Sequence, residues 1–332
     1  MTREVGDAIR PAPGSVVTTG TFDGVHRGHQ AIIRYLVDRA RRVGGVPTVV
    51  TFDPHPREVL TGQPVPLLTT LDERADLLEA LGVERFVVVP FSRDLSLLEP
   101  EDYVADVLVG RIGMREIVIG YDHRFGRKAR GDQALLERLG GEHGFSVDVI
   151  PKQVEGDVTV SSTEIRRLLA DAGDAARAAV LLGRPYRITG TVVHGDARGR
   201  GIGFPTANVE PANDRKLVPA IGVYAVRATL PGGAQAAGAQ AAGAQTAGAV
   251  AEGMMNVGRR PTFEADGATR AEVHLFDTDA DLYGRRLAVD VVARLRGERR
   301  FDGVDALVAQ LGQDREAARA VLAAPPPTTD AA

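Results

Sequence analysis

The first half of the chain alternates short apolar runs with longer amphipathic stretches. Runs rich in β-branched residues predict strands at residues 15–19, 46–52, 85–91, 116–120 and 145–150. Between them, apolar residues recur at helical spacing and predict helices that include residues 72–81, 100–109 and 132–143. Apolar strands separated by helices favour a parallel sheet that is covered on both faces and binds ligands beyond the carboxyl ends of its strands.

A helical stretch at residues 173–182 precedes a change of pattern. Strand-like runs then follow one another without helices until Val304, at residues 186–194, 222–230, 254–257, 270–276 and 286–295. Successive strands of this kind predict an antiparallel sheet or a small barrel. We place the boundary near Arg184, which gives domains at residues 1–183 and 184–324.

Two segments fit neither pattern. Residues 231–253 carry a short Ala-Gly-Gln repeat with few charges and no large apolar residue, which predicts a flexible hairpin extension. A short alanine-rich helix is the alternative. The tail at residues 325–332 is expected to be disordered.

The bulk composition narrows the class of protein. A chain of 332 residues suits two domains, and a net charge of -4 gives no electrostatic footprint for nucleic acid. The absence of cysteine excludes disulfides, thiolate metal sites and cysteine nucleophiles. The first residues are charged, and no apolar run approaches the roughly 18 residues of a membrane span. We expect a cytoplasmic protein without nucleic-acid or membrane partners, and the composition leaves its oligomeric state open.

The turn after the first long strand, TTGTFDGVHRGHQA, carries the clearest candidate chemistry. Gly20 and Gly24 allow a tight turn and a close approach of the backbone to a ligand. His26 and His29 stand three apart where a helix begins, so their rings lie on one side of it. Free N–H groups, the positive helix end and imidazole donors together suit the phosphates of a nucleotide. A glycine-rich turn alone is more often a solvated loop, but the histidines, Asp23 and the strand-to-helix setting favour the nucleotide site.

Two further segments fall at the same edge of the predicted sheet. In TFDPHP, two prolines fix the backbone and present Asp53 and His55 outward. In IGYDHRFGRKARGD, Asp122 and Arg124 precede a glycine-bounded basic loop. Taken singly, the first could be a plain loop and the second a solvated run of charge.

The segment VSSTEIRRLL begins a helix with three hydroxyl residues and a nearby arginine, which alone would usually be a simple cap. Together with HRGH, however, it resembles the SSTxIR and HxGH signatures of nucleotidyltransferases, specifically the adenylyltransferase half of the prokaryotic bifunctional riboflavin kinase/FAD synthetase family. The basic segment resembles the family's DFRFG, with His123 where phenylalanine is common. No Walker-type GxxxxGK[ST] occurs, which disfavours a P-loop kinase.

The resemblance implies that the two signatures bracket one ATP triphosphate. The phosphate of FMN would attack the α-phosphorus of ATP and release pyrophosphate, with His26 and His29 as catalytic contacts. The other residues expected to contact nucleotide or flavin in this half are Gly20, Phe22, Asp23, Gly24, Asp53, His55, Asp122, Arg124, Ser161, Ser162, Thr163 and Arg166.

In the second half, GDARGRGIG leads directly into FPTAN. Its glycines permit close approach to phosphates, and Arg198 and Arg200 can add charge. Thr206 and Asn208 alternate on an extended segment, so both side chains face the same way. Two oxygen ligands beside ATP phosphates make a plausible Mg²⁺ site, because magnesium keeps waters or phosphates in its remaining positions.

This string resembles the riboflavin kinase signature, in which the threonine and asparagine of PTAN bind the metal. The segments MNVGRRPTF, AEVHLFD, DLYGRRL and LRGERRF match the same family in order. In AEVHLFD, alternation puts Glu272 and His274 on one face and Val273 and Leu275 on the other, toward the core. The resemblance implies that Glu272 is the base for the ribityl 5′-hydroxyl. The ligand contacts expected in this half are Gly195, Arg198, Gly199, Gly201, Gly203, Asn256 and Arg296.

We therefore expect a Rossmann-like nucleotidyltransferase domain with a parallel sheet, followed by a mainly antiparallel β-barrel riboflavin kinase domain with a C-terminal helix. Its substrates would be ATP, riboflavin and FMN, with Mg²⁺ as cofactor. One alternative is a monofunctional riboflavin kinase whose first domain binds nucleotide without catalysis. The departure from the family motif at His123 is the only feature that favours it. The other is a non-enzymatic flavin-responsive protein, which would not need Glu272, Thr206 and Asn208 together.

Overall fold

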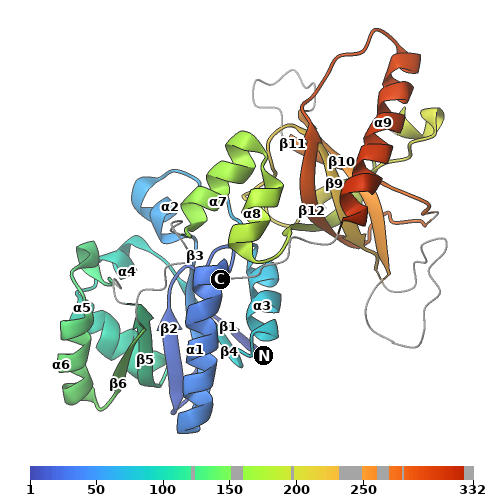
Figure 1. Ribbon diagram of the computed structural model, residues 1–332. Helices are drawn as coiled ribbons and strands as arrows, with labels where there is room; N and C mark the ends of the chain where they lie inside the picture. Colours follow the sequence, from blue (N-terminus) through green and yellow to red (C-terminus); the bar gives the residue numbers. More distant parts are fainter. Residues whose placement is uncertain are drawn as a thin grey trace. The chain divides into compact units, whose positions relative to one another are not determined.

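The computed structural model describes residues 1–120, 124–150, 160–195, 198–231, 249–259, 269–278 and 280–324. The chain forms two compact units, Met1–Ser161 and Ser162–Ala332, which are described separately below (Figure 1). The expected contact of Asp122, most of the Ala-Gly-Gln segment and the tail lie outside the described residues.

The first unit is built on a parallel sheet with the strand order β1-β4-β3-β2-β5-β6. Its strands are β1 (Thr2–Val5), β2 (Ser15–Thr19), β3 (Val46–Asp53), β4 (Arg85–Pro90), β5 (Met114–Gly120) and β6 (Ser146–Ile150). The parallel sheet confirms the prediction. Strand β1 was missed because its TREV sequence is polar and mostly exposed at the sheet edge.

Both faces of this sheet are buried, since successive strand residues point to opposite sides. Val16 and Val49 pack with helices α1 (Arg27–Val43) and α3 (Leu71–Ala80), while Val17 and Val50 pack with η2 (Tyr103–Arg111) and α6 (Gln133–His143). Figure 1 shows α1 lying along the sheet. The shorter elements are η1 (Gly6–Ala8), α2 (Pro56–Thr61), α4 (Arg93–Leu97), α5 (Pro100–Asp102) and η3 (Arg127–Ala129).

The predicted helix at residues 100–109 is present, but it changes from an α-helix to a π-helix along its length. It begins as α5 and continues as the π-helical segment η2, in which the N–H of Ile112 bonds to the carbonyl of Val107. A five-residue repeat of this kind is wider than the α-helical one, so apolar spacing alone does not reveal it.

The second unit contains a closed antiparallel barrel with the strand order β10-β11-β8-β7-β12-β9. Its strands are β7 (Tyr186–Val193), β8 (Ala207–Pro211), β9 (Gly222–Thr229), β10 (Val250–Arg259), β11 (Thr269–Leu275) and β12 (Arg286–Arg296). The segment η5 (Arg198–Ile202) connects β7 to β8. The C-terminal helix α9 (Val304–Ala323) covers strands β9, β10 and β12, and buries Ala318 and Leu322. The barrel and its helix confirm the second part of the predicted fold.

Three helical segments precede the barrel: α7 (Ser162–Arg167), η4 (Leu168–Ala172) and α8 (Ala175–Leu182). They group with the second unit, because α8 packs on β7 and β12 and the N–H of Ala220 bonds to the carbonyl of Leu169. The compact units therefore divide about twenty residues before the boundary that we placed near Arg184. The predicted helix at 173–182 begins later, since Gly173 ends η4 with a φ of 65°.

The Ala-Gly-Gln insert is shorter than we predicted at its C-terminal end. Strand β10 begins at Val250 and pairs with β9 from there, so residues 250–253 belong to the barrel. The N–H of Leu230 bonds to the carbonyl of Ala249 and closes this end of the ladder.

Candidate active sites

The histidine turn, residues 20–29, joins β2 to α1 and brings His26 and His29 together. His26 is the N-cap of α1, and its Nδ1 accepts a hydrogen bond from the N–H of His29 at 3.4 Å. The two rings stack with centroids 3.6 Å apart and an interplanar angle of 18°. Gly24, with a φ of 83°, supplies the tight turn. The two imidazoles therefore lie side by side at the start of a helix, as the sequence predicts.

The charge of His29 is set by its surroundings. Burial lowers the pKa of His29 well below 6.5, and the neighbouring His26 and Arg74 lower it further. Its Nδ1 is buried and has no hydrogen-bond partner among the described residues. A neutral imidazole can donate from only one nitrogen, so His29 is suited to donate a hydrogen bond rather than to carry a positive charge.

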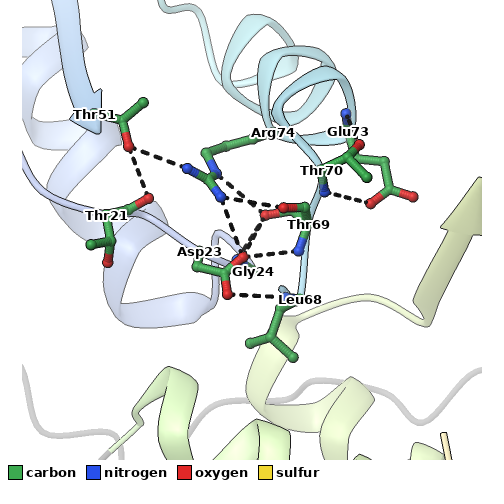
Figure 2. A network of polar contacts seen from close by, with 9 residues as sticks. All are labelled: Thr21, Asp23, Gly24, Thr51, Leu68, Thr69, Thr70, Glu73 and Arg74. Atoms are coloured by element: carbon green, nitrogen blue, oxygen red, sulfur yellow. Dashed lines mark hydrogen bonds and ion pairs between the residues drawn. The ribbon is translucent and has the colours of Figure 1, made fainter. Parts of the chain in front are cut away.

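Asp23 belongs to the histidine turn, and its side chain is fully buried. Figure 2 shows its carboxylate accepting hydrogen bonds from the N–H groups of Leu68 and Thr69 at 3.0 and 2.9 Å. The Thr69 hydroxyl donates to the same carboxylate at 3.0 Å, and Arg74 Nη2 lies 3.4 Å from it. Asp23 therefore ties the turn to the segment before α3.

The network continues through Arg74 to the adjacent strand. Arg74 Nη1 donates to the Thr51 hydroxyl at 3.2 Å, which donates to the carbonyl of Thr21 at 3.0 Å (Figure 2). The N–H of Gly24 donates to the Thr69 hydroxyl at 3.0 Å. The buried Asp23 therefore supports the turn in this structure, and its expected contact with the nucleotide stays a prediction.

Phe22 occupies a similar supporting place. It is buried in the core beside α1, and its ring meets His29 edge-on with centroids 5.1 Å apart. A Cβ added at Gly20 would lie 3.2 Å from the Phe22 ring, so the turn is closely packed there. Gly20 itself lines the cavity described next.

A cavity of ≈ 750 Å³ opens beside the histidine turn at the carboxyl ends of β2, β3 and β4. Its wall is largely apolar, with Phe52, Leu60, Phe91, Leu95, Leu97, Tyr103 and Phe125. Burial raises the pKa of Tyr103 to about 12, so its hydroxyl stays protonated at neutral pH. The place agrees with the rule that ligands of parallel sheets bind beyond the strand ends.

Cationic side chains also line this cavity. Arg124 pairs with Asp132 at 3.1 Å and Arg127 pairs with Glu99 at 2.8 Å. Within the described part of the chain, no carboxylate lies within ion-pair distance of Arg93 or Lys128, the other two cations of the wall. The cavity thus combines an aromatic wall with cations that are available to an anion.

The remaining residues expected to bind ligand in the first half of the chain belong to both compact units. Asp53 ends β3, and His55 is the N-cap of α2, where its Nδ1 accepts from the N–H of Arg57 at 3.2 Å. Ser161 is the last residue of the first unit, whereas Ser162, Thr163 and Arg166 belong to α7 in the second. Their predicted contact with an ATP that His26 and His29 also bind stays a prediction.

In the barrel, three polar side chains form a row across neighbouring strands. Asn208 on β8 lies opposite Glu272 on β11, which lies opposite Asn256 on β10. Residues that are directly opposite on antiparallel strands point to the same side of the sheet. The sequence separates these side chains by up to 64 positions, and the barrel register places them together.

Two cavities flank this region of the barrel. One of ≈ 340 Å³ is lined by Glu272, Asn256, Arg296, Gly199 and His274, among others. The other, of ≈ 320 Å³, is lined by residues that include Val273, Leu275 and Tyr283. The opposite placement of Glu272 and Val273 confirms the predicted alternation. Thr206 lines both cavities.

The glycine segment packs closely on the PTAN residues. A Cβ at Gly195 would lie 2.0 Å from Asn208 Nδ2, and one at Gly199 would lie 2.1 Å from the carbonyl oxygen of Phe204. Gly201 and Gly203 have open space instead, although Gly203 has a φ of 82°. Arg198 is the first residue of η5 and directly precedes Gly199.

Asn208 has an oxygen suited to a ligand. Its Oδ1 is buried and has no hydrogen-bond partner in the described part of the chain. A buried polar atom without a partner raises the free energy of the folded state. The Asn208 Oδ1 is therefore suited to bind a cation or to accept a hydrogen bond from a ligand.

Two family models match the chain. The FAD synthetase model matches residues 9–164, and the riboflavin kinase model matches residues 182–322. The bifunctional riboflavin kinase/FMN adenylyltransferase of Escherichia coli K12 is 39% identical over 310 residues, which cover 93% of each chain. The relative with the same description from Bacillus subtilis 168 is 36% identical and covers 92% of this chain and 91% of its own. The chain belongs to this bifunctional family.

The fold agrees with that membership. A solved structure from Streptococcus pneumoniae, described as a macrolide-efflux protein, has a TM-score of 0.78 and 33% identity, covering 94% of this chain and 95% of its own. That description applies to the Streptococcus protein. In the described part of this chain, no helix has the length and apolarity needed to cross a membrane. Matches to both domains favour a bifunctional riboflavin kinase/FMN adenylyltransferase over the monofunctional alternative.

The barrel also contains site residues that sequence reasoning did not single out. The ring of His194 stacks on Tyr283 with centroids 3.9 Å apart, next to the cavity of ≈ 320 Å³. His274 Nδ1 lies 2.8 Å from the carbonyl of Pro205, so it donates there and anchors the segment before Thr206. Burial lowers the pKa of His274. The DLYGRRL match contained Tyr283, but nothing in the sequence indicated its stacking partner.

Proposed function

We propose that the protein phosphorylates riboflavin to FMN in the barrel and adenylates FMN to FAD in the first unit, with ATP as the donor in both reactions. The main observation that supports kinase activity in the barrel is the position of Thr206, because this residue lines two cavities at once. A donor in one cavity and an acceptor in the other would exchange a phosphoryl group beside it.

Riboflavin is assigned to the cavity of ≈ 340 Å³, which contains Glu272 and a largely apolar wall with Phe204 and Phe301. ATP is assigned to the cavity of ≈ 320 Å³, where Tyr283 and its stacked partner His194 can extend their stack onto an adenine ring. The glycine segment would then face the phosphates.

In the kinase reaction, Glu272 orients the ribityl 5′-hydroxyl and accepts its proton. The hydroxyl oxygen forms a bond to the γ-phosphorus as the bond between that phosphorus and the bridging oxygen breaks, and ADP leaves. Asn256, opposite Glu272 in the ladder, and Arg296 help to hold the flavin.

Asn208 Oδ1 and the Thr206 hydroxyl would hold Mg²⁺. The fit rests on the buried, unpartnered Oδ1 and on the hard oxygen donors that magnesium prefers. The described residues contain no cluster of three or more His, Cys, Asp or Glu side chains suited to a metal, which agrees with an ion held partly by phosphates and water. When bound, Mg²⁺ neutralises charge on the β- and γ-phosphates.

In the first unit, FMN is assigned to the cavity of ≈ 750 Å³. The aromatic wall would pack against the flavin ring, and Arg93 and Lys128 would attract the phosphate. That phosphate forms a bond to the α-phosphorus of ATP while pyrophosphate leaves. His26 and His29 donate hydrogen bonds to the ATP phosphates and stabilise the developing charge.

The test is a time course with riboflavin, Mg²⁺ and ATP that is labelled at either the α- or the γ-phosphorus. The expected result is γ-label in FMN first and α-label only in FAD, because the two reactions transfer different parts of ATP. Absence of α-label from every flavin would leave the protein a riboflavin kinase alone. Absence of both labels would overturn the assignment of the barrel as well.

A further inference from the structure

We propose that Asp314, on helix α9, is a positioning residue for riboflavin phosphorylation, because it fixes the guanidinium of Arg296 at the wall of the cavity that contains Glu272. The inference rests on the proposed assignment of riboflavin to that cavity. It adds a residue from outside all the matched motifs and gives the C-terminal helix a part in the reaction.

The two side chains form a bidentate ion pair. Arg296 Nε lies 2.9 and 3.1 Å from the two carboxylate oxygens of Asp314, and Arg296 Nη2 lies 2.7 Å from Oδ2. The Asp314 side chain is 4% exposed and the Arg296 side chain 17% exposed. Paired geometry of this kind fixes the plane of a guanidinium as well as its distance.

Further contacts hold the same plane. Arg296 Nη1 donates to the carbonyl of Gly297 at 2.9 Å, and the guanidinium carbon lies 5.8 Å from the centroid of the Phe301 ring. Arg296 and Phe301 both line the cavity, whereas Asp314 does not. Asp314 therefore acts on the cavity through Arg296 and not by contact with a substrate.

Helix α9 extends this support by one turn. Gln310 Nε2 donates to Asp314 Oδ1 at 3.0 Å, and Arg299 Nη1 donates to Gln310 Oε1 at 3.0 Å. Arg299 also lines the cavity, as do Leu307 and Leu311 on the same helix. This part of α9 thus ties two cationic side chains of the cavity wall and supplies part of its apolar surface.

The pair has a functional consequence because arginine is long and flexible. Without the carboxylate, the side chain can leave the orientation in which its remaining N–H groups meet the flavin, and ordering it again opposes binding. The loss affects binding of riboflavin more than proton transfer to Glu272. The expected signature is a rise in the KM for riboflavin with a smaller change in kcat.

The experiment compares Asp314→Asn with wild type in both reactions of the same preparation. We expect the riboflavin KM to rise about tenfold and kcat to change less than about threefold, as for loss of one charged hydrogen-bonded contact. FMN adenylylation, which belongs to the other unit, should be unchanged. Asp314→Glu, which keeps the carboxylate, should recover most of the affinity. The matched control is Asp290→Asn, which breaks the bidentate pair with Arg187 on the more exposed side of the barrel and should leave KM unchanged.

Arg296→Met separates this inference from the assignment on which it rests. If Arg296→Met raises the KM and Asp314→Asn does not, Asp314 has no positioning role although the flavin assignment stands. If Arg296→Met leaves the KM unchanged, the flavin assignment is wrong and the inference falls with it. In the Arg296→Met background, Asp314→Asn should add nothing, and an additive loss would contradict the proposed route through Arg296.

If Asp314→Asn fails to fold, a milder variant still tests the positioning role of Asp314. Gln310→Ala removes one support of the carboxylate and keeps the ion pair. We expect the riboflavin KM to rise about threefold at an unchanged melting temperature, because only one hydrogen bond to the carboxylate is lost and the ion pair is retained. An unchanged KM in this variant would overturn the inference.

Discussion

Glu272 and Asn208 lie directly opposite each other on the neighbouring antiparallel strands β11 and β8. Cβ atoms in such positions are about 4.5–5.5 Å apart, so the proposed base and the proposed metal ligand lie next to one another. A proton acceptor and a cation site on one face of the barrel are what transfer of a phosphoryl group to a hydroxyl requires. The strand register of the barrel thus brings the proposed base and the proposed metal ligand together.

Replacement of Glu272 by glutamine should separate the two reactions. The amide cannot accept the ribityl proton, so riboflavin phosphorylation should fall by about 10²- to 10⁴-fold, the usual contribution of a general base. FMN supplied directly should still be converted to FAD, because that reaction belongs to the first unit. Chromatographic separation of the flavins measures both outcomes. Full kinase activity in Glu272→Gln would show that another group, or the phosphate itself, accepts the proton.

Gly195 should not tolerate alanine. Its added Cβ would lie 2.0 Å from Asn208 Nδ2, so Asn208 must move and carry its Oδ1 away from the proposed Mg²⁺ site. A displacement on this scale lowers kcat by about 10²-fold, and the Mg²⁺ concentration for half-maximal activity should rise. The matched control is Gly312→Ala, since a Cβ there has nothing within 4 Å and lies on helix α9. Equal kinase activity in the two variants would contradict the tight packing proposed for Asn208.

Loss of Arg74 should destabilise the first unit. Removal of one partner of a buried ion pair leaves an uncompensated charge, so Arg74→Met should lower the free energy of unfolding by about 3–5 kcal/mol and abolish FAD formation. Asp72→Asn on the same helix breaks the exposed pair with Arg3 and should cost less than about 1 kcal/mol. Urea denaturation of both variants measures the difference. A small and equal cost for both would remove the supporting role that we assign to the Asp23 network.

His29 should make stability depend on pH in a defined direction. Its pKa in the folded protein is well below the value of 6.5 expected in the unfolded chain, so the unfolded chain takes up the proton first as the pH falls. The free energy of unfolding should therefore decrease below pH 6.5, by at most about 1.4 kcal/mol per pH unit from this one group. His274, whose pKa is also lowered by burial, acts in the same direction.

The pH dependence is checked with His29→Gln. This variant should show a shallower loss of stability on acidification, whereas His143→Gln at the exposed end of α6 should match wild type. NMR of the His29 ring gives an independent readout, since its resonances should not titrate near pH 6.5. A normal titration midpoint for His29 would contradict the burial of its Nδ1.

Much of the fold followed from local pattern. Strand β2 begins and ends where its apolar run predicted, and β3 to β6 differ from the predictions by a residue or two at their ends. Strand β1 was not predicted because an edge strand with exposed polar residues shows no alternation of apolar and polar positions. The compact units divide before α7, whereas the hydrophobic pattern changes near Arg184, because the packing of α8 on the barrel leaves no local mark in the sequence.

Some residues of the candidate sites could likewise be identified from the sequence, whereas others could be found only from the fold. His26 and His29, or Thr206 and Asn208, are close in sequence, and their spacing together with the resemblance to family motifs identified them. Arg74 is a charged residue inside an ordinary amphipathic helix, and only the fold brings it to Asp23, 51 residues away. The sequence likewise gave no reason to connect Asp314 with Arg296.

The sequence by itself determined most of the strands and helices and indicated which short motifs are candidates for chemistry, because both depend on residues within a few positions of one another. The tertiary structure decided which motifs meet. Closure of the barrel aligned Asn208, Glu272 and Asn256 on one face, and packing of α9 brought Asp314 to Arg296. Strand register and helix packing minimise the free energy of the whole domain, so they cannot be deduced from any single stretch of chain.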